Sequence, residues 1–204
     1  LSWGSNDISI KFNASVCITL AGIALLLGAV DPARVKSIRL SAGVTASIAS
    51  ATLFQHISGI NLGIDTLIFD EAINAAATSE PGRMGIPASL ALTVIGLALV
   101  LTTFGRTRRA AARLAVFSLC IAALPLAGYL FGADQLFSIP RYTGIAFRTA
   151  AMIAVLSLGV IALVREHGLA TTFSREDAGG AMFRRLALPL VLLSVTVGLV
   201  RLRA

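Results

Sequence analysis

Charged residues are scarce in this chain of 204 residues. They make up 13% of the total, while 56% of the residues are hydrophobic and the mean hydropathy is +0.87. Average soluble domains carry about 25% charged and about 45–50% apolar residues. The apolar surplus is too large to be buried in one core of this size, and lipid is the solvent that accepts it. The composition therefore excludes an ordinary soluble globule and favours a membrane protein.

Cysteine is also scarce. The two cysteines, Cys17 and Cys120, lie inside apolar runs and form no spaced cluster, so neither a disulfide framework nor a metal motif is expected. A glycine-rich phosphate loop and a nucleophile constellation are lacking as well. We therefore expect no catalytic residue and no metal site in this chain, and the sequence points to no particular cofactor.

Acidic side chains are missing from the apolar runs, because all ten Asp and Glu residues fall in the segments between them. Proton relays and ion-coupled transport usually need an ionisable group at membrane depth. The pattern therefore argues against a proton-driven pump or transporter and leaves, among transporters, a facilitator of an uncharged solute.

Six long apolar runs are what the chain does have. Each is close to the roughly 20 helical residues that cross a bilayer core, and none alternates as the strands of a membrane barrel do. The fold class predicted is all-α: one integral-membrane domain over residues 1–204, a polytopic bundle of six transmembrane helices. The runs are Ile10 to Val30, Val35 to Ser58, Gly85 to Phe104, Ala110 to Phe131, Thr143 to Val164 and Met182 to Leu202.

Basic residues gather on one side of these predicted helices. The links after the first, third and fifth helices, Asp31 to Arg39, Gly105 to Arg113 and Arg165 to Arg185, hold eleven Lys or Arg against four acids, and the opposite side holds six of each sign. Basic excess marks the cytoplasmic side, so both ends of the chain are predicted to face outward. The net charge of +7 is then explained by the basic residues that orient the chain in the membrane, and no nucleic-acid partner is expected.

An internal repeat relates the first two pairs of helices. Residues Ala14 to Leu27 match Ala88 to Leu101 at seven of fourteen positions, and Ser58 to Asn61 falls on Phe131 to Asp134. A third pair aligns weakly through Gly159. We predict three repeated helical hairpins, at about residues 10–58, 85–131 and 143–202, with an outer connection over residues 59–84.

Small residues recur at four-residue spacing on three of the predicted helices. Such faces let helix backbones approach closely in lipid, and they indicate packing inside the bundle, in a homodimer or in a larger membrane complex. The rows are Gly43, Ser47 and Ala51; Ala146, Ala150 and Ala154; and Ser194 and Gly198.

Two candidate ligand-binding residues lie near the outer end of the first hairpin. His56 could contact a ligand, sense pH or bind haem, or it could be an interfacial polar residue bonded to its neighbour Gln55. The chain has no second histidine at membrane depth, since His167 lies in a basic inner link, so haem is not predicted. Asp65 lies in the long outer connection, which serves either as a lid and sensing surface or as a structural cap.

Two further candidates, Tyr129 and Arg148, lie at the outer ends of the fourth and fifth helices. Tyr129 belongs to a group of aromatic residues that forms either an interfacial belt or the wall of a ligand pocket. Arg148 could pair with an outer acid such as Asp134 or Asp65, bind an anionic ligand, or extend to the lipid headgroups.

Several motifs in their order along the chain resemble the multi-pass N-terminal sensory region of bacterial membrane-bound signalling proteins. They are Gly63 to Phe69, Pro81 to Met84 leading into Ala88 to Leu101, Gly128 to Ala133, and Tyr142 to Ala146. In that family the region precedes PAS, histidine-kinase or diguanylate-cyclase modules. The resemblance implies a bacterial inner-membrane sensory or input domain that works as a dimer, with a parent protein that is a sensor histidine kinase or a diguanylate cyclase.

A second interpretation stays open. The small-residue faces and the lack of charge at membrane depth equally suit a structural or accessory subunit that packs within a larger membrane protein complex. In both interpretations the lipid bilayer is the surrounding partner and the chain itself carries no chemistry.

Overall fold

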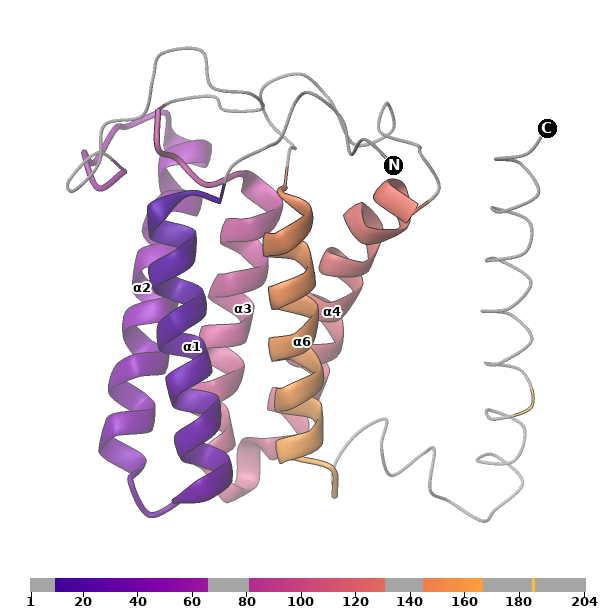
Figure 1. Ribbon diagram of the computed structural model, residues 1–204. Coiled ribbons are helices and arrows are strands. Elements are labelled where there is room, and N and C mark those ends of the chain that lie inside the picture. The colour runs from indigo at the N-terminus through magenta and orange to yellow at the C-terminus, as the bar shows by residue number, and fades with distance from the viewer. Residues whose placement is uncertain (1–9, 66–80, 131–144, 167–184, 186–204) are drawn as a thin grey trace.

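Five α-helices form in the part of the chain that the computed structural model describes, namely residues 10–65, 81–130, 145–166 and 185 (Figure 1). They are α1 (Phe12–Val30), α2 (Val35–Ser58), α3 (Ile86–Thr102), α4 (Arg108–Leu130) and α6 (Phe147–Leu163), with a 3-10 turn, η1 (Gly105–Thr107), before α4. The all-α prediction is confirmed for these residues. The sixth predicted span, Met182 to Leu202, lies outside them except for residue 185.

Local sequence sets where these helices begin and end. The charged turn after α1 contains an ion pair between Arg34 Nε and Asp31 Oδ2 at 2.8 Å. Gly59 ends α2 with a φ of 72°, a left-handed conformation that glycine adopts without a steric penalty, and its N–H donates to the Gln55 carbonyl at 3.0 Å. Pro87 lies in the first turn of α3, where its missing N–H is of no consequence.

Two segments are long and apolar enough to cross a membrane. One is α1, and the other is Gly105–Tyr129, which comprises η1 and nearly all of α4. The apolar helices α3 and α6 are shorter, at 17 residues each. Helix α2 has 24 residues but includes more polar side chains, among them Ser47 and Ser50 on its exposed side.

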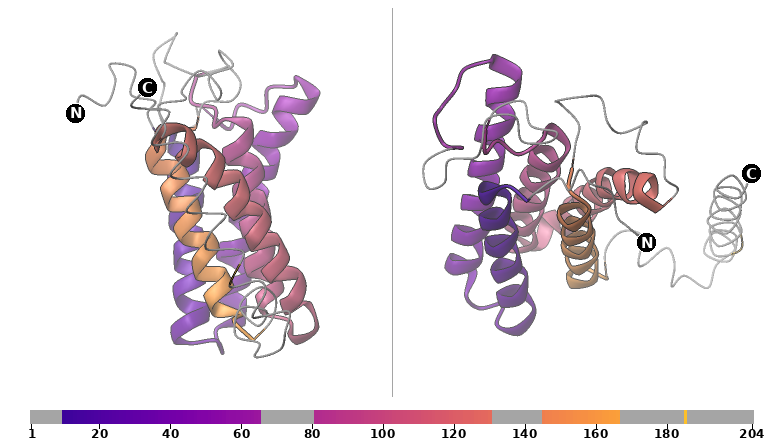
Figure 2. Two further views of the ribbon diagram at one scale, coloured as in Figure 1. Left: turned by 90° about the vertical axis from the view of Figure 1, so that its right-hand side faces the viewer. Right: turned by 45° about the horizontal axis from the view of Figure 1, so that its top comes forward.

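Helix α3 lies at the centre of the bundle. It contacts each of the other four α-helices, and ten of its 17 residues are buried. Helices α1, α3 and α6 contact one another, while α2 packs against α1 and α3, and α4 packs against α3 and α6 (Figures 1 and 2). The described part is thus an inner triangle of three helices with two outer helices packed against its sides.

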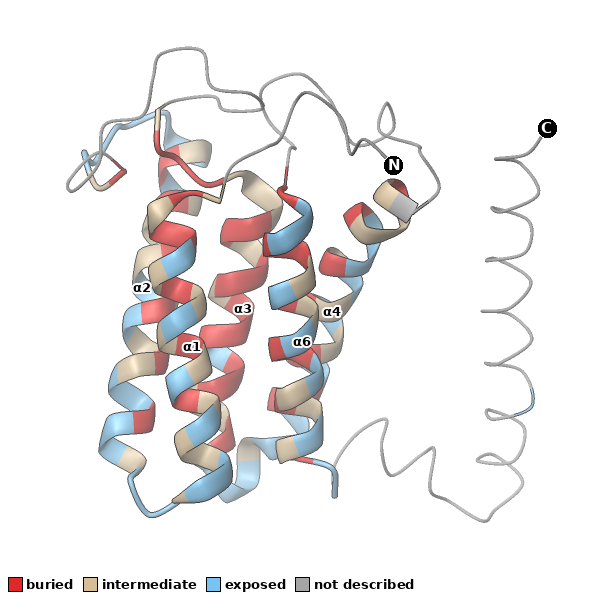
Figure 3. Cartoon of the chain, viewed as in Figure 1, coloured by how far each residue is buried: buried red, intermediate tan, exposed pale blue. Residues whose placement is uncertain are grey.

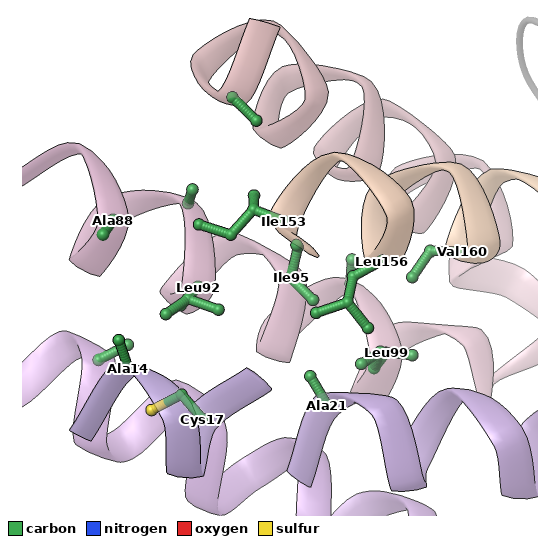
Figure 4. Packing of buried hydrophobic residues seen from close by; sticks show 14 of the residues in the cluster. Ala14, Cys17, Ala21, Ala88, Leu92, Ile95, Leu99, Ile153, Leu156 and Val160 are labelled. Carbon is green, nitrogen blue, oxygen red and sulfur yellow. The ribbon is translucent and has the colours of Figure 1, made fainter. Parts of the chain in front are cut away.

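The core lies where the three inner helices meet (Figure 4). Larger side chains from α3 and α6 pack against small side chains of α1. The contributing residues shown are Ala14, Cys17 and Ala21 of α1, Ala88, Leu92, Ile95 and Leu99 of α3, and Ile153, Leu156 and Val160 of α6.

Exposed residues line the outward faces of the bundle (Figure 3), and many of them have large apolar side chains. Leu26 of α1 is 63% exposed, Leu124 of α4 is 60% exposed and Val155 of α6 is 67% exposed. Helices α1 and α3 carry no charged residue at all. In water such faces are unfavourable, whereas in hydrocarbon they need no cover.

Candidate functional site

A buried carboxylate organises one end of the bundle. Asp65 follows α2 in the connection toward α3, and the whole residue is 6% exposed. Its Oδ2 accepts hydrogen bonds from Gln55 Nε2 at 2.6 Å and from Arg83 Nε at 2.9 Å. Its Oδ1 accepts a hydrogen bond from Asn13 Nδ2 at 3.2 Å. We call these four residues the Asp65 cluster.

The Asp65 cluster ties together three segments that are distant in the sequence. Asn13 lies in the first turn of α1, Gln55 lies in the last turn of α2, and Arg83 lies just before α3. The carboxylate therefore lies beside the N-terminal end of α1, whose helix dipole favours a negative charge, and beside the C-terminal end of α2, whose dipole opposes it. A displacement of Asp65 would change hydrogen bonds to all three segments together.

The amides of the cluster also hold the backbone of the connection. Asn13 Nδ2 donates to the Ile64 carbonyl at 3.0 Å, and Gln55 Oε1 accepts from the Leu62 N–H at 2.6 Å. The connection folds back over the ends of α1 and α2, because the same side chains that bind the carboxylate also pair its neighbouring peptide groups.

Gly82 makes the approach of Arg83 to Asp65 possible. Its φ is 72°, and a Cβ atom at this position would collide with the carbonyl oxygen of Asp65. Only glycine meets both requirements, since other residues are strained at positive φ and would also need the space that the Asp65 backbone occupies.

The charges of the cluster compensate each other in a site removed from water. A buried ion pair loses hydration free energy, and its geometry and additional hydrogen bonds must offset that loss. The Asp65 carboxylate has three side-chain donors, which is the arrangement that makes a buried charge tolerable. The cluster is chemically a structural tie, and its polar groups are directed at one another.

His56 and Tyr129 make corresponding contacts in the two hairpins. The Nε2 of His56 lies 2.9 Å from the Met84 carbonyl oxygen, and the Tyr129 hydroxyl donates to the Ile145 carbonyl at 2.9 Å. Met84 and Ile145 each lie two residues before the next helix, α3 or α6. Because a carbonyl only accepts, Nε2 carries the proton in the His56 bond. The bonds link the end of α2 to the start of α3 and the end of α4 to the start of α6.

Tyr129 also packs edge-on against Phe147 at the start of α6, with ring centroids 5.6 Å apart and an angle of 87° between the ring planes. This is a favourable geometry for two aromatic rings. The contact joins α4 to α6 at the same end of these helices as the carbonyl bond.

The four residues singled out from the sequence each make their own contacts in the structure. Asp65 is in the cluster, His56 lies beside Gln55 but bonds to Met84, and Tyr129 joins α4 to the segment before α6. Arg148 is exposed in the first turn of α6, and the partner of Asp65 is Arg83 instead.

Sequence reasoning did not assign Asn13, Gln55 or Arg83 to the site. The available signal was the position of each polar residue at the end of an apolar run, next to the segment that contains Asp65 or to its partner helices. Among the described residues there is no group of three or more His, Cys, Asp or Glu side chains that could hold a metal ion.

No protein-family model, curated protein or solved structure matches this chain.

Proposed function

We propose that this chain is the membrane-embedded input region of a bacterial inner-membrane signal-transduction protein, built from six spans in three hairpins, working as a dimer and without chemistry of its own. The Asp65 cluster is the observation that carries the proposal. It couples α1, α2 and the segment before α3 through one carboxylate, so a stimulus that displaces Asp65 acts on three helices together.

The exposed apolar faces support the membrane part of the proposal. Large side chains such as Leu26 and Val155 point away from the core, and charged residues of the described helices lie in or near their first or last turns. With 17 residues, α3 and α6 match the lower limit of about 17–25 residues for a membrane span.

The direct test uses the full-length gene product in inner-membrane vesicles. Phosphoryl transfer from ATP to histidine, or formation of cyclic di-GMP from GTP, is the expected output. Asp65→Asn should change that output, because it weakens the coupling of the three segments. The matched control is Asp31→Asn, which removes a carboxylate from an exposed pair in the turn between α1 and α2. A full-length product with neither activity would overturn the proposal.

One observation favours the accessory-subunit alternative. The row Gly43, Ser47 and Ala51 on α2 is only partly covered by the described helices: a Cβ atom at Gly43 would meet nothing within 4 Å, and Ser47 is exposed. A helix of another protein could pack closely on this row. Purification at fixed stoichiometry with a larger membrane complex would favour this function over the input region.

A further inference from the structure

Three inner helices form a triangle, and an outer helix packs against two of its three sides in the described part of the chain. The inner helices α1, α3 and α6 all contact one another, α2 packs against α1 and α3, and α4 packs against α3 and α6. Each outer helix thus packs against its own hairpin partner and against one further inner helix. The third side, between α6 and α1, has no outer helix among the described residues.

Burial reflects the same asymmetry. Helix α3, with an outer helix on both flanks, buries ten of its 17 residues. Helix α1 buries five of 19, and α6 buries six of 17. Both α1 and α6 have one described outer neighbour, so each has a side that the described chain leaves open.

Two close contacts between α1 and α6 show which faces of these helices border the open side. Gly159 of α6 lies against the side chain of Leu25, and a Cβ atom at Gly28 of α1 would come 3.0 Å from Leu163 Cδ2. Residues three or four apart share a helix face, so Gly22 lies next to Leu25, and Val155 lies next to Gly159. We call the outward surface formed by Ile18, Gly22 and Leu25 of α1 with Met152, Val155 and Gly159 of α6 the α1–α6 seam.

The seam is apolar and partly exposed. Val155 is 67% exposed, Met152 is 42% exposed, and a Cβ atom at Gly22 would meet nothing within 4 Å. A helix that carries small residues could therefore approach the backbone of α1 at this position.

The internal repeat indicates which part of α1 should be covered. Gly22 corresponds to Gly96 in the match of Ala14 to Leu27 with Ala88 to Leu101. Gly96 packs directly on α2, where its Cβ would come 2.7 Å from Ala46 N and 2.8 Å from Ala42 O. Helix α2, the outer helix before α3, thus packs on Gly96. The equivalent glycine on α1, Gly22, has open space beside it.

We propose that the apolar segment 182–202 of this chain packs in the α1–α6 seam as the third outer helix and closes a ring of three hairpins. It follows α6 as α2 follows α1 and as α4 follows α3, so it would be the hairpin partner of α6. Its row of Ser194 and Gly198 has the same four-residue spacing as Ala42 and Ala46 on α2. The inference rests on the six-span arrangement of the proposed function.

Disulfide cross-linking in membranes tests this inference. The background is the full chain with Cys17→Ala and Cys120→Ala, and with a specific protease site inserted after Thr172. Gly22→Cys is combined with single cysteines at each position from 190 to 198. Since a disulfide needs Cβ atoms about 3.5–4.5 Å apart, cross-links should peak near Ser194, close to the middle of both helices, and recur at helical spacing.

The matched control is Gly43→Cys on α2 with the same series of partners. Both glycines have open space for a side chain, so neither substitution disturbs the described packing. After proteolysis without reductant, the two fragments should stay joined for the Gly22 series and separate for the Gly43 series.

The other outcomes are each decisive. Fragments joined in the Gly43 series alone, or a disulfide between two copies at Gly22, would overturn the inference about the seam. If positions 190–198 react with a water-soluble maleimide in intact membranes, the six-span arrangement itself fails. If they are protected and yet no cross-link forms with Gly22, the seam inference fails alone.

Discussion

The Nε of Arg83 lies 2.9 Å from Oδ2 of Asp65, and the two side chains are only 8% and 4% exposed. This ion pair differs from the other pair in the described chain, Arg34 with Asp31, whose side chains are 65% and 42% exposed. Solvent screens the second pair and not the first, so the two pairs should differ strongly in their effect on stability.

Removal of the Asp65 charge should be costly. Asp65→Asn leaves Arg83 buried without a compensating charge, a change that typically costs about 3–5 kcal/mol. Asp31→Asn should cost at most about 1 kcal/mol, because exposed ion pairs contribute little. The measurement is the free energy of unfolding in detergent micelles, and equal losses for the two variants would contradict the assignment of the cluster as a buried tie.

A second prediction concerns the glycine beside the cluster. Gly82→Ala places a Cβ against the Asp65 carbonyl at a positive φ, while Gly63→Ala has a similar φ of 67° but open space around it. Both variants should lose about 1–2 kcal/mol from backbone strain, and Gly82→Ala should lose more because of the collision. Thermal unfolding of the two variants side by side gives the comparison. A Gly63→Ala variant as unstable as Gly82→Ala would show that φ alone accounts for the effect.

Helix positions could be predicted from the sequence far better than the cluster. The prediction Val35 to Ser58 for the second helix agrees with α2, and Ile10 to Val30 differs from α1 only at its first residues. Apolar runs bounded by charged turns are local features, so the sequence specifies them directly. The hairpin arrangement of all six spans stays a prediction.

The cluster depends on contacts between distant residues, and local pattern does not determine these. Asn13 and Asp65 are 52 residues apart, and the choice of Arg83 as the partner of Asp65 depends on the backbone conformation at Gly82. Among the cations on the predicted outer side, sequence reasoning considered Arg148 as a partner of Asp65 and did not consider Arg83. Only the fold of the connection shows which of them reaches the carboxylate.

Helix contact between α2 and α3 provides a third prediction. Gly96→Ala would bring a Cβ within 2.7 Å of Ala46 N, so the two helices must separate and the protein should be destabilised. Gly43→Ala on α2 meets no atom within 4 Å and should stabilise the helix by up to about 1 kcal/mol through the higher helix propensity of alanine. Opposite signs of the change in unfolding free energy are expected. Stabilisation by Gly96→Ala would contradict the close approach of these helices.

The hydroxyl of Tyr129 provides a fourth prediction. Tyr129→Phe leaves the Ile145 carbonyl without this donor but keeps the ring against Phe147, so the expected loss is about 0.5–1.5 kcal/mol. Tyr129→Leu should lose more, because it also removes the edge-on ring contact. Unfolding free energies of the two variants separate the hydrogen bond from the ring contact, and identical losses would mean that the ring contact adds nothing.

The proposed function requires that the bundle is embedded in a membrane, with the Asp65 cluster at its outer end and the basic turns at its inner end. Labelling of intact cells with a membrane-impermeant maleimide tests it most directly, using single cysteines at the exposed positions Ile60, beside the cluster, and Arg106, in η1. We predict that Ile60→Cys reacts in intact cells and that Arg106→Cys reacts only after the membrane is opened. Reaction of Arg106→Cys from outside, with Ile60→Cys protected, would contradict the claim.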